Sequence, residues 1–339
     1  MRFKGISRKT VNISQAGLIK TELIQPSQRL PLIIKPAVDD ISLISWTANN
    51  QTFIETMLLQ HGGILFRGFK LQLASEFEVL IRALSGKLTE YSYRSTPRSQ
   101  VSGNIYTSTE YPADQSIPLH NEMAYASSWP MKIWFFCLEA AQQGGETPIA
   151  DSQKVFQRIN PAIKERFLHK KIMYVRNYGE GLDLHWETVF QTNEKSEVEN
   201  YCRQAGIEFE WKNSDHLRTR QVCQAVATHP KTGETVWFNQ AHLFHVSSLE
   251  AEVSDFLLSV LKESDLPRNA YYGDGSNIED SVLDEIREIY RQEAIMFPWQ
   301  KGDILLLDNM LAAHGRMPFS GARKVVVGMA EPYSLAIQN

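Results

Sequence analysis

Apolar residues recur at helical spacing in five stretches of the chain. The clearest stretch covers residues 50–60, whose apolar face consists of Phe53, Ile54, Met57 and Leu58. Two glycines follow His61, and glycine readily takes the left-handed conformation that ends many helices. We therefore expect His61 to lie in the last helical turn, where the helix dipole favours it, rather than to bind a metal. The same spacing predicts helices at about 74–84, 195–205, 249–263 and 278–291.

Short apolar runs bounded by turn residues predict the strands. Their positions are about 64–69, 132–141, 171–178, 219–228, 234–240, 302–308 and 323–331. Because these runs are short and separated by longer inserts, the pattern predicts a mainly β fold, a sandwich or barrel with flanking helices outside it. We expect one domain over 1–339, with an irregular N-terminal arm at about 1–38 and helical insertions at about 179–218 and 249–298.

Composition narrows the classes of function. The 339 residues carry a net charge of −4 with scattered Lys and Arg, which gives no basic field for nucleic acid. No apolar run is long enough to cross a membrane, and no signal peptide pattern follows the first residues. Cys137, Cys202 and Cys223 are widely spaced and read as reduced, mostly buried thiols. We therefore expect a cytoplasmic protein.

Two segments far apart in the chain carry candidate metal ligands. His120 and Glu122 are two residues apart, so both side chains can turn to one face. A single His and Glu pair with this spacing is common on exposed strands and turns, and a metal site would need a third ligand. His314 follows the apolar run at 302–308 and supplies one. Two histidines and a carboxylate that leave the other positions open form the facial triad of non-haem Fe(II) oxygenases.

An acidic co-substrate on such a metal needs a cation at its far end, and arginine offers a planar fork that meets a carboxylate with two hydrogen bonds. Arg323 begins the strand predicted after His314. Arg316 is the rival, because it lies only two residues past His314. Thr147 follows a Gly-Gly turn and can add a neutral hydroxyl.

Residues 86–118 are rich in Tyr, Ser, Thr, Pro and Arg, and we expect them to form a substrate loop, since loops on a rigid frame carry specificity. The candidate substrate contacts are Tyr106, Ser108, Arg176 and Asn239. The arginines that could meet a carboxylate or phosphate are Arg94, Arg98, Arg218 and Arg220, although a structural or surface role is the simpler interpretation of each. A second metal site at His229, His242 and His245 lacks a nearby Cys or acid at ligand spacing.

Taken in order, several motifs resemble the taurine dioxygenase-like (TauD/TfdA) family of Fe(II)- and 2-oxoglutarate-dependent oxygenases. They are His120-Asn121-Glu122, Gly144-Gly145-Glu146-Thr147, Asp308-Asn309 before His314-Gly315-Arg316, and Gly321-Ala322-Arg323-Lys324. A second set of motifs resembles the SyrP-like branch of peptide natural-product pathways. It consists of residues 107–112, 229–234 and 236–240. The resemblance covers roughly residues 40–332.

This resemblance implies a double-stranded β-helix, or jelly roll, with the metal at its open mouth. It also implies that O₂ is divided between 2-oxoglutarate and the substrate, which gives succinate, CO₂ and attack on an unactivated C–H bond. By position, His120, Glu122 and His314 would bind iron, and Thr147 and Arg323 would hold 2-oxoglutarate. The family usually has Asp where this chain has Glu122. Related halogenases have Ala or Gly there, so Glu122 favours oxygen transfer over halogenation.

We therefore expect an oxygenase that uses Fe(II), 2-oxoglutarate and O₂ to hydroxylate an amino acid or an amino-acid-derived unit in specialised metabolism. Both a free unit and one tethered to a carrier protein fit this expectation, and desaturation or cyclisation would begin with the same hydrogen abstraction. Two other classes stay open from the residues alone. One is a non-catalytic jelly-roll binding protein, and the other is a zinc hydrolase built on His120 and Glu122, which would leave Thr147 and Arg323 without a role.

Overall fold

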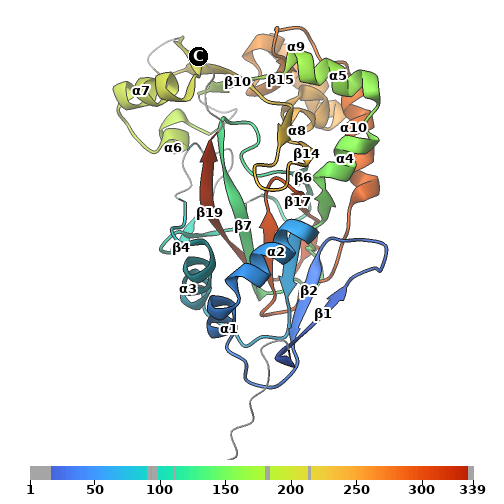
Figure 1. Cartoon of the computed structure of the whole chain (residues 1–339). Coiled ribbons are helices and arrows are strands. Elements are labelled where there is room, and N and C mark those ends of the chain that lie inside the picture. Colours follow the sequence, from blue (N-terminus) through green and yellow to red (C-terminus); the bar gives the residue numbers. More distant parts are fainter. Residues whose placement is uncertain are drawn as a thin grey trace, which may run out of the picture.

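A computed structural model describes residues 17–89, 93, 98–109, 111–179, 184–212 and 215–334. Their framework is a set of mostly antiparallel sheets with helices on the outer sides (Figure 1). The first 16 residues of the expected N-terminal arm, and the candidate Arg94, lie outside the described residues.

The largest sheet has eight strands and forms one wall of the site. Its order is β1 (Ile19–Leu23), β2 (Leu32–Pro36), β3 (Gly63–Phe66), β16 (Ile304–Asp308), β7 (Ser128–Glu139), β19 (Lys324–Ser334), β5 (Ile105–Thr107) and β4 (Gln100–Ser102). Neighbouring strands are antiparallel except β2 and β3. Alternation along the strands divides the side chains between two cores, because successive residues point to opposite faces. In β7, for example, Trp134 and Phe136 join one core while Ile133 and Phe135 join the other.

Three helices cover the outer face of this sheet: α1 (Leu43–Asn49), α2 (Gln51–His61) and α3 (Ala74–Ser85). Leu58 and Phe77 pack there against Phe66 and Phe136. As expected, α2 ends at Gly62 in the left-handed conformation, and the N–H of Gly62 donates to Leu58. Burial of these apolar side chains fixes the helices to the sheet.

A smaller sheet lies across the inner face and carries the candidate ligands. It consists of β6 (Ile117–His120), β17 (Ala312–Arg316) and β9 (Ile149–Asp151). The core between the two sheets contains Phe135 and Leu305 from one side and Ile149 and Ala312 from the other. Two further sheets have only two short strands each. They are β8 (Gln143–Gly144) with β18 (Phe319–Ser320), and β13 (Val226–Thr228) with β14 (Thr235–Trp237).

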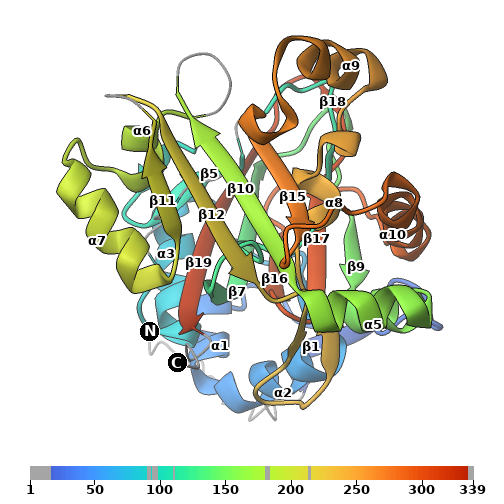
Figure 2. The same ribbon diagram turned by 90° about the horizontal axis from the view of Figure 1, so that it is seen from above.

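A four-stranded sheet lies over one end of this sandwich (Figure 2). Its strands are β11 (Glu208–Trp211), β12 (Leu217–Cys223), β10 (Ile172–Tyr178) and β15 (Arg268–Tyr272). The remaining helices are α4 (Ser152–Arg158), α5 (Pro161–Lys170), α6 (Trp186–Phe190), α7 (Lys195–Ala205), α8 (Ala241–Phe244), α9 (Ala251–Val260) and α10 (Asp280–Glu293), with 3-10 turns at Val246–Ser248 and Glu263–Asp265. Among the described residues, no helix combines the length and apolarity needed to span a membrane.

The mainly β architecture and all five predicted helices are confirmed, but two expectations about segments are wrong in part. The arm is not irregular over its described portion, because β1 and β2 form there and the prolines at positions 31 and 36 lie at the ends of β2 rather than inside it. The two insertions are not purely helical. Each contributes a strand, β11 and β15, because alternating side chains let these segments pair with the neighbouring strands. That residues 1–339 form one domain stays a prediction.

Candidate active site

The three predicted metal ligands meet at one end of the smaller sheet. His120 ends β6 and lies directly opposite His314 of β17 in the strand register, and Glu122 follows two residues later. The ligand atoms of these side chains all lie within 4.8 Å of one another. Strand pairing therefore joins residues that are almost 200 positions apart in the chain.

Electrostatics and hydrogen bonding leave these groups fit to bind a divalent cation. The pKa values of His120 and His314 are lowered, chiefly because surrounding protein atoms replace water around each ring, so both imidazoles are neutral. Nδ1 of His120 donates to Pro118 O at 2.8 Å, which leaves Nε2 with its lone pair. Nε2 of His314 is 3.8 Å from Oε2 of Glu122, beyond hydrogen-bond distance. Two neutral nitrogens and one carboxylate around such a gap match the donor set of a facial triad.

Asn309 holds the main chain of Glu122. Its Oδ1 accepts the N–H of Glu122 at 2.7 Å, and its Nδ2 donates to the Glu122 and Pro130 carbonyls at 2.9 Å each. Asn309 is fully buried and lies just after β16, in the Asp-Asn motif before His314. The residue therefore links the two segments that carry the ligands.

Two further side chains hold the main chain on either side of His120. Nε2 of His242 donates to Leu119 O at 2.9 Å, and Nε2 of Gln240 donates to Asn121 O at 2.7 Å. Both lie in or just before α8, so this helix fixes the ligand segment from outside the smaller sheet. The other two histidines considered for a second metal site bond elsewhere: His229 to Asp308, and His245 to Ser247.

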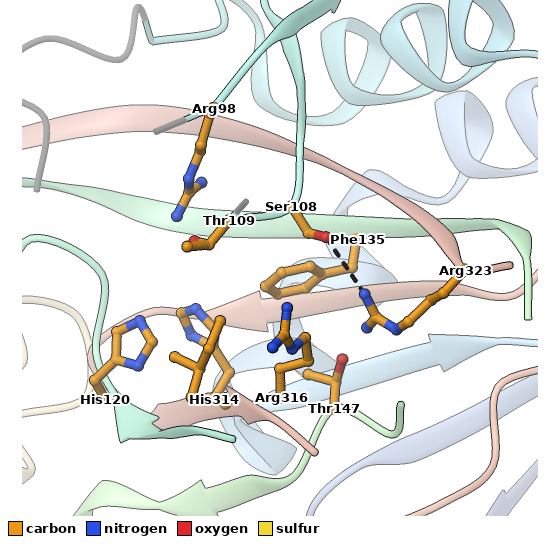
Figure 3. A pocket seen from close by; sticks show the side chains of 11 residues that line it. Arg98, Ser108, Thr109, His120, Phe135, Thr147, His314, Arg316 and Arg323 are labelled. Atoms are coloured by element: carbon orange, nitrogen blue, oxygen red, sulfur yellow. Dashed lines mark hydrogen bonds between the residues drawn. The ribbon is translucent and has the colours of Figure 1, made fainter. Parts of the chain in front are cut away.

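A buried arginine contacts the acidic ligand. Nη2 of Arg98 donates to Oε2 of Glu122 at 2.8 Å, and the two side chains are only 4% and 3% exposed. Figure 3 shows Arg98 pointing from the far wall of the pocket toward the two histidines. Arg98 was one of four arginines that the sequence did not distinguish, and the structure places it within the site.

A pocket extends from the histidines toward Thr147 and Arg323 (Figure 3). Nε of Arg323 donates to Gly145 O at 2.9 Å, and Nη1 approaches Ser108 Oγ at 3.4 Å. Burial is the main cause that lowers the pKa of Arg323 to about 10, still far above neutrality, so the guanidinium is charged. Thr147 Oγ1 accepts from Trp299 Nε1 at 3.1 Å, which leaves its own hydrogen for an anion.

The Gly-Gly turn shapes this end of the pocket, as the sequence indicated. Gly144 and Gly145 both have positive φ, at +67° and +72°. A Cβ on Gly145 would lie 2.9 Å from Cδ of Arg323, and one on Gly144 would lie 2.2 Å from Pro318 O. Only glycine accepts both the backbone conformation and the close contact, so the turn allows Arg323 to lie flat against it.

Arg316 also lines the pocket, but main-chain carbonyls already occupy its terminal nitrogens. Nη1 donates to Tyr111 O at 2.9 Å, and Nη2 donates to Pro112 O and Gln115 O at 2.5 and 2.7 Å. The guanidinium also lies over the ring of Phe319, 5.2 Å from its centroid. These contacts fasten the substrate loop to β17.

A second hollow adjoins the first at Arg98, Thr109, Ile117 and His120, which line both. It opens on the side of Glu122 and is walled by α8 and β15. The wall residues from these elements are Leu243, Phe244 and Arg268. The three candidate metal ligands therefore lie between two hollows, and arginine side chains line both of them.

Of the four candidate substrate contacts, only Ser108 lines these pockets. Tyr106 points into the core between the two sheets. Arg176 is 1% exposed and lies over the rings of Tyr93 and Tyr178. The amide of Asn239 bonds the main chain at Ala225 and Ala241.

The other two arginines considered from the sequence form ion pairs, Arg218 with Asp265 and Arg220 with Glu210. Sequence reasoning missed Phe135, Arg268 and Trp299. Asn309 and Gln240 carried a signal, because each lies in one of the family-like motifs of the sequence.

Comparison with known proteins adds the deciding observation. The model of the family described as "Taurine catabolism dioxygenase TauD, TfdA family" matches residues 26–330. The chain belongs to the TauD/TfdA family. The dapdiamide synthesis protein DdaC of Enterobacter agglomerans is 44% identical over 287 residues, which are 84% of this chain and 87% of DdaC. A clavaminate synthase-like protein of Arabidopsis thaliana is 29% identical over 317 residues, 90% of this chain and 92% of that protein.

Solved structures show the same fold. PvcB from Pseudomonas aeruginosa superposes with a TM-score of 0.56 at 14% identity and covers 96% of this chain and 94% of its own. A second PvcB structure is described as "an Fe, alpha-ketoglutarate dependent oxygenase from an isonitrile synthetic pathway" and gives a TM-score of 0.54 at 13% identity, with the same coverage. The expected double-stranded β-helix of the TauD/TfdA family is thus confirmed.

This member of the TauD/TfdA family is a 2-oxoglutarate-dependent non-haem iron dioxygenase, and Fe(II), 2-oxoglutarate and O₂ are its metal and co-substrates. The two alternatives left open by the residues, a non-catalytic binding protein and a zinc hydrolase, are therefore not supported. The finer resemblance to a SyrP-like branch stays a prediction.

Proposed function

We propose that this enzyme hydroxylates an unactivated C–H bond of an amino acid or an amino-acid-derived unit in specialised metabolism. The carrying observation is the group formed by His120, Glu122 and His314, which lies between two arginine-containing pockets. Similar proteins support a place in specialised metabolism, since DdaC is a dapdiamide synthesis protein and PvcB is from an isonitrile synthetic pathway. In the balanced reaction, substrate, 2-oxoglutarate and O₂ give hydroxylated substrate, succinate and CO₂.

In this proposal His120, Glu122 and His314 hold the iron. When bound, iron supplies the oxidising chemistry by bringing 2-oxoglutarate and O₂ together on the positions that the protein leaves open. The protein keeps both histidines neutral by burial, so their lone pairs bind metal rather than protons. Asn309 keeps Glu122 in place through its main chain.

The pocket at Thr147 and Arg323 receives 2-oxoglutarate. The guanidinium of Arg323 meets the distal carboxylate of the co-substrate, and the hydroxyl of Thr147 donates a hydrogen bond to it. Ser108 already bonds Arg323 and orients it. Arg316 adds positive charge from the same wall, while its terminal nitrogens stay bound to the substrate loop.

The second hollow receives the prime substrate. Arg268 offers a cation for a carboxylate, which every free amino acid carries, and Leu243 and Phe244 offer apolar contact for its aliphatic part. A carrier-tethered substrate would reach the iron through the same hollow as a thioester. Desaturation or cyclisation is the second outcome, because it begins at the same C–H bond.

Anaerobic titration tests the iron and co-substrate roles. Adding Fe(II) and 2-oxoglutarate to the protein should give a weak visible charge-transfer band, and Glu122→Ala should lower the iron affinity seen in this titration and abolish hydroxylation. Glu252→Ala, a change at an exposed acid on α9, is the matched control and should keep both. A Glu122→Ala variant with near-normal iron affinity and turnover would remove Glu122 from the metal site.

Succinate release tests the substrate class. We would screen free amino acids and carrier-bound aminoacyl thioesters and analyse each product by mass spectrometry. A product that gains one oxygen atom supports hydroxylation, whereas a product that only loses two hydrogens supports desaturation or cyclisation. Stimulation by neither class of substrate would overturn the proposed substrate while leaving the oxygenase assignment intact.

A further inference from the structure

Gln240 lies just before α8 and is fixed through both its main chain and its side chain. Its main-chain N–H donates to the hydroxyl of Tyr174 at 2.7 Å, and its Nε2 donates to Asn121 O at 2.7 Å. Its carbonyl accepts the N–H of Phe244 at 3.0 Å in the single turn of α8. The amide group is therefore held in one orientation.

The contact with Asn121 decides which end of this amide is left over. A main-chain carbonyl only accepts hydrogen bonds, so the NH₂ group must point to Asn121 and Oε1 must point elsewhere. No residue in the described part of the chain donates to this Oε1, and Gln240 lines the second hollow. Gln240 is only 5% exposed, and polar atoms of buried residues normally have a hydrogen-bond partner. A ligand in the hollow can supply that partner.

The wall around Gln240 suits a ligand that brings its own donor. Leu243 and Phe244 follow three and four residues later, so one helical turn presents all three side chains to the hollow. Phe244 is held against the rings of Tyr125 and Tyr174, at centroid distances of 5.2 and 5.0 Å. Since Leu243 and Phe244 have no polar side-chain atoms, Oε1 of Gln240 is the acceptor that this turn offers.

We propose that Gln240 is a substrate-recognition residue, whose Oε1 accepts an N–H of the prime substrate and thereby selects a substrate that carries an amine or amide nitrogen. This inference rests on the proposed function, in which the second hollow receives the prime substrate. The same amide bonds Asn121, which lies between His120 and Glu122. Gln240 therefore holds the substrate nitrogen at a fixed place relative to the proposed iron ligands.

Matched pairs of compounds test this inference in the assay of succinate release. Each free amino acid is compared with the carboxylic acid that has hydrogen in place of the amine, and each carrier-bound aminoacyl thioester with its deamino counterpart. N-acetyl amino acids form a third group, which offers an amide N–H instead of an ammonium.

The wild-type enzyme should prefer the nitrogen-bearing member of a pair. Its Michaelis constant should be roughly 5- to 150-fold lower, because a substrate without the donor leaves a buried oxygen unpaired. A stronger response to the N-acetyl compound would identify the nitrogen as an amide, and a stronger response to the free amino acid would identify it as an amine. Equal Michaelis constants within every pair would overturn the inference.

Two substitutions show whether Gln240 causes the preference. Gln240→Met replaces the amide by an apolar side chain of similar length, and the preference within a pair should then disappear. Gln240→Glu keeps an oxygen acceptor but loses the NH₂ group, and it should keep the preference. A preference that survives in Gln240→Met, or is lost in both variants, would overturn the inference, because the second result would assign the effect to the Asn121 contact.

Gln224→Met is the matched control. Nε2 of Gln224 also donates to main-chain carbonyls near the ligands, Ala124 O at 3.2 Å and Ala126 O at 3.4 Å, but this residue lines neither hollow. The control should keep the wild-type preference, and an equal loss in Gln224→Met and Gln240→Met would contradict a specific role of Gln240. If no member of any pair stimulates the wild-type enzyme, the proposed substrate class fails and the inference fails with it, whereas stimulation without preference overturns the inference alone.

Discussion

Asn309 grips the main chain of Glu122 from both sides, since it accepts the N–H at 2.7 Å and donates to the carbonyl at 2.9 Å. The two residues are 187 positions apart, and both are buried. The polypeptide is therefore fixed at the acidic ligand before any metal binds. The ligand position depends on an amide side chain as well as on the strand pairing of the histidines.

Replacing Asn309 by Ala should weaken both the fold and the metal site. The free energy of unfolding should fall by about 3 kcal/mol, because each buried polar group left unpaired costs about 1–3 kcal/mol. Fe(II) affinity should fall about tenfold, as for other residues that orient metal ligands. Urea unfolding and anaerobic metal titration measure the two effects.

Asn177→Ala is the control for this prediction. Its amide bonds the carbonyls of Ser264 and Leu266 at 3.0 and 2.7 Å, on a strand outside the metal site. It should lower stability without lowering metal affinity. Equal loss of metal affinity in both variants would show that Asn309 acts only through general stability.

Arg323→Gln should raise the apparent Michaelis constant for 2-oxoglutarate far more than that for the prime substrate. Losing a charge-assisted contact costs on the order of 2–3 kcal/mol, or roughly 30- to 150-fold in affinity. Arg316→Gln should chiefly lower the melting temperature, because Arg316 holds three carbonyls of the substrate loop. Steady-state kinetics on both variants tests these roles. A larger rise in the Michaelis constant for 2-oxoglutarate in Arg316→Gln than in Arg323→Gln would mean that the roles of the two arginines are reversed.

Arg268→Gln should separate substrate binding from co-substrate binding. Because Arg268 lines only the second of the two hollows, 2-oxoglutarate affinity should be near that of the wild type. The Michaelis constant for an acidic prime substrate found in the screen should rise about tenfold or more, since hydrogen bonds to charged groups contribute about 1.5–3 kcal/mol. Parallel titrations with 2-oxoglutarate and with the prime substrate measure the two effects separately. An unaltered constant for the prime substrate would exclude Arg268 from its recognition.

The three cysteines should resist alkylation in the native protein at pH 8. Burial raises the pKa of Cys137, Cys202 and Cys223 to about 12 each. At pH 8, far below these pKa values, the thiols stay protonated, and only a thiolate attacks iodoacetamide. Mass spectrometry should show little labelling until urea unfolds the protein. Rapid labelling of any one thiol without urea would contradict its burial.

Much of the candidate site was open to prediction from sequence because its motifs are local. His120 and Glu122 are two residues apart, and Thr147 follows its glycine pair directly, so their spacing survives in any fold that forms the same turns. The helix at 51–61 was equally accessible, since its apolar stripe and terminal glycine act within one element. The short strand β17 was missed because it is buried throughout and shows no alternation.

The arginines show where sequence reasoning ends. Arg98 and Arg218 were equal candidates as residue types, yet one contacts Glu122 and the other pairs with Asp265. Arg176 carried the same charge but lies in the core between aromatic rings. A guanidinium reaches far from its backbone, so its partner depends on how distant segments pack and not on its neighbours in the chain.

The sequence by itself determined the chemical groups, their order and the periodic elements that carry them, because these depend on side-chain type and short-range spacing. Only the tertiary structure decided which side chains surround the Glu122 carboxylate, which arginine is held by main-chain carbonyls, and where the two hollows lie. Those choices follow from contacts between residues far apart in the chain, whose free energy depends on the packing of the whole fold.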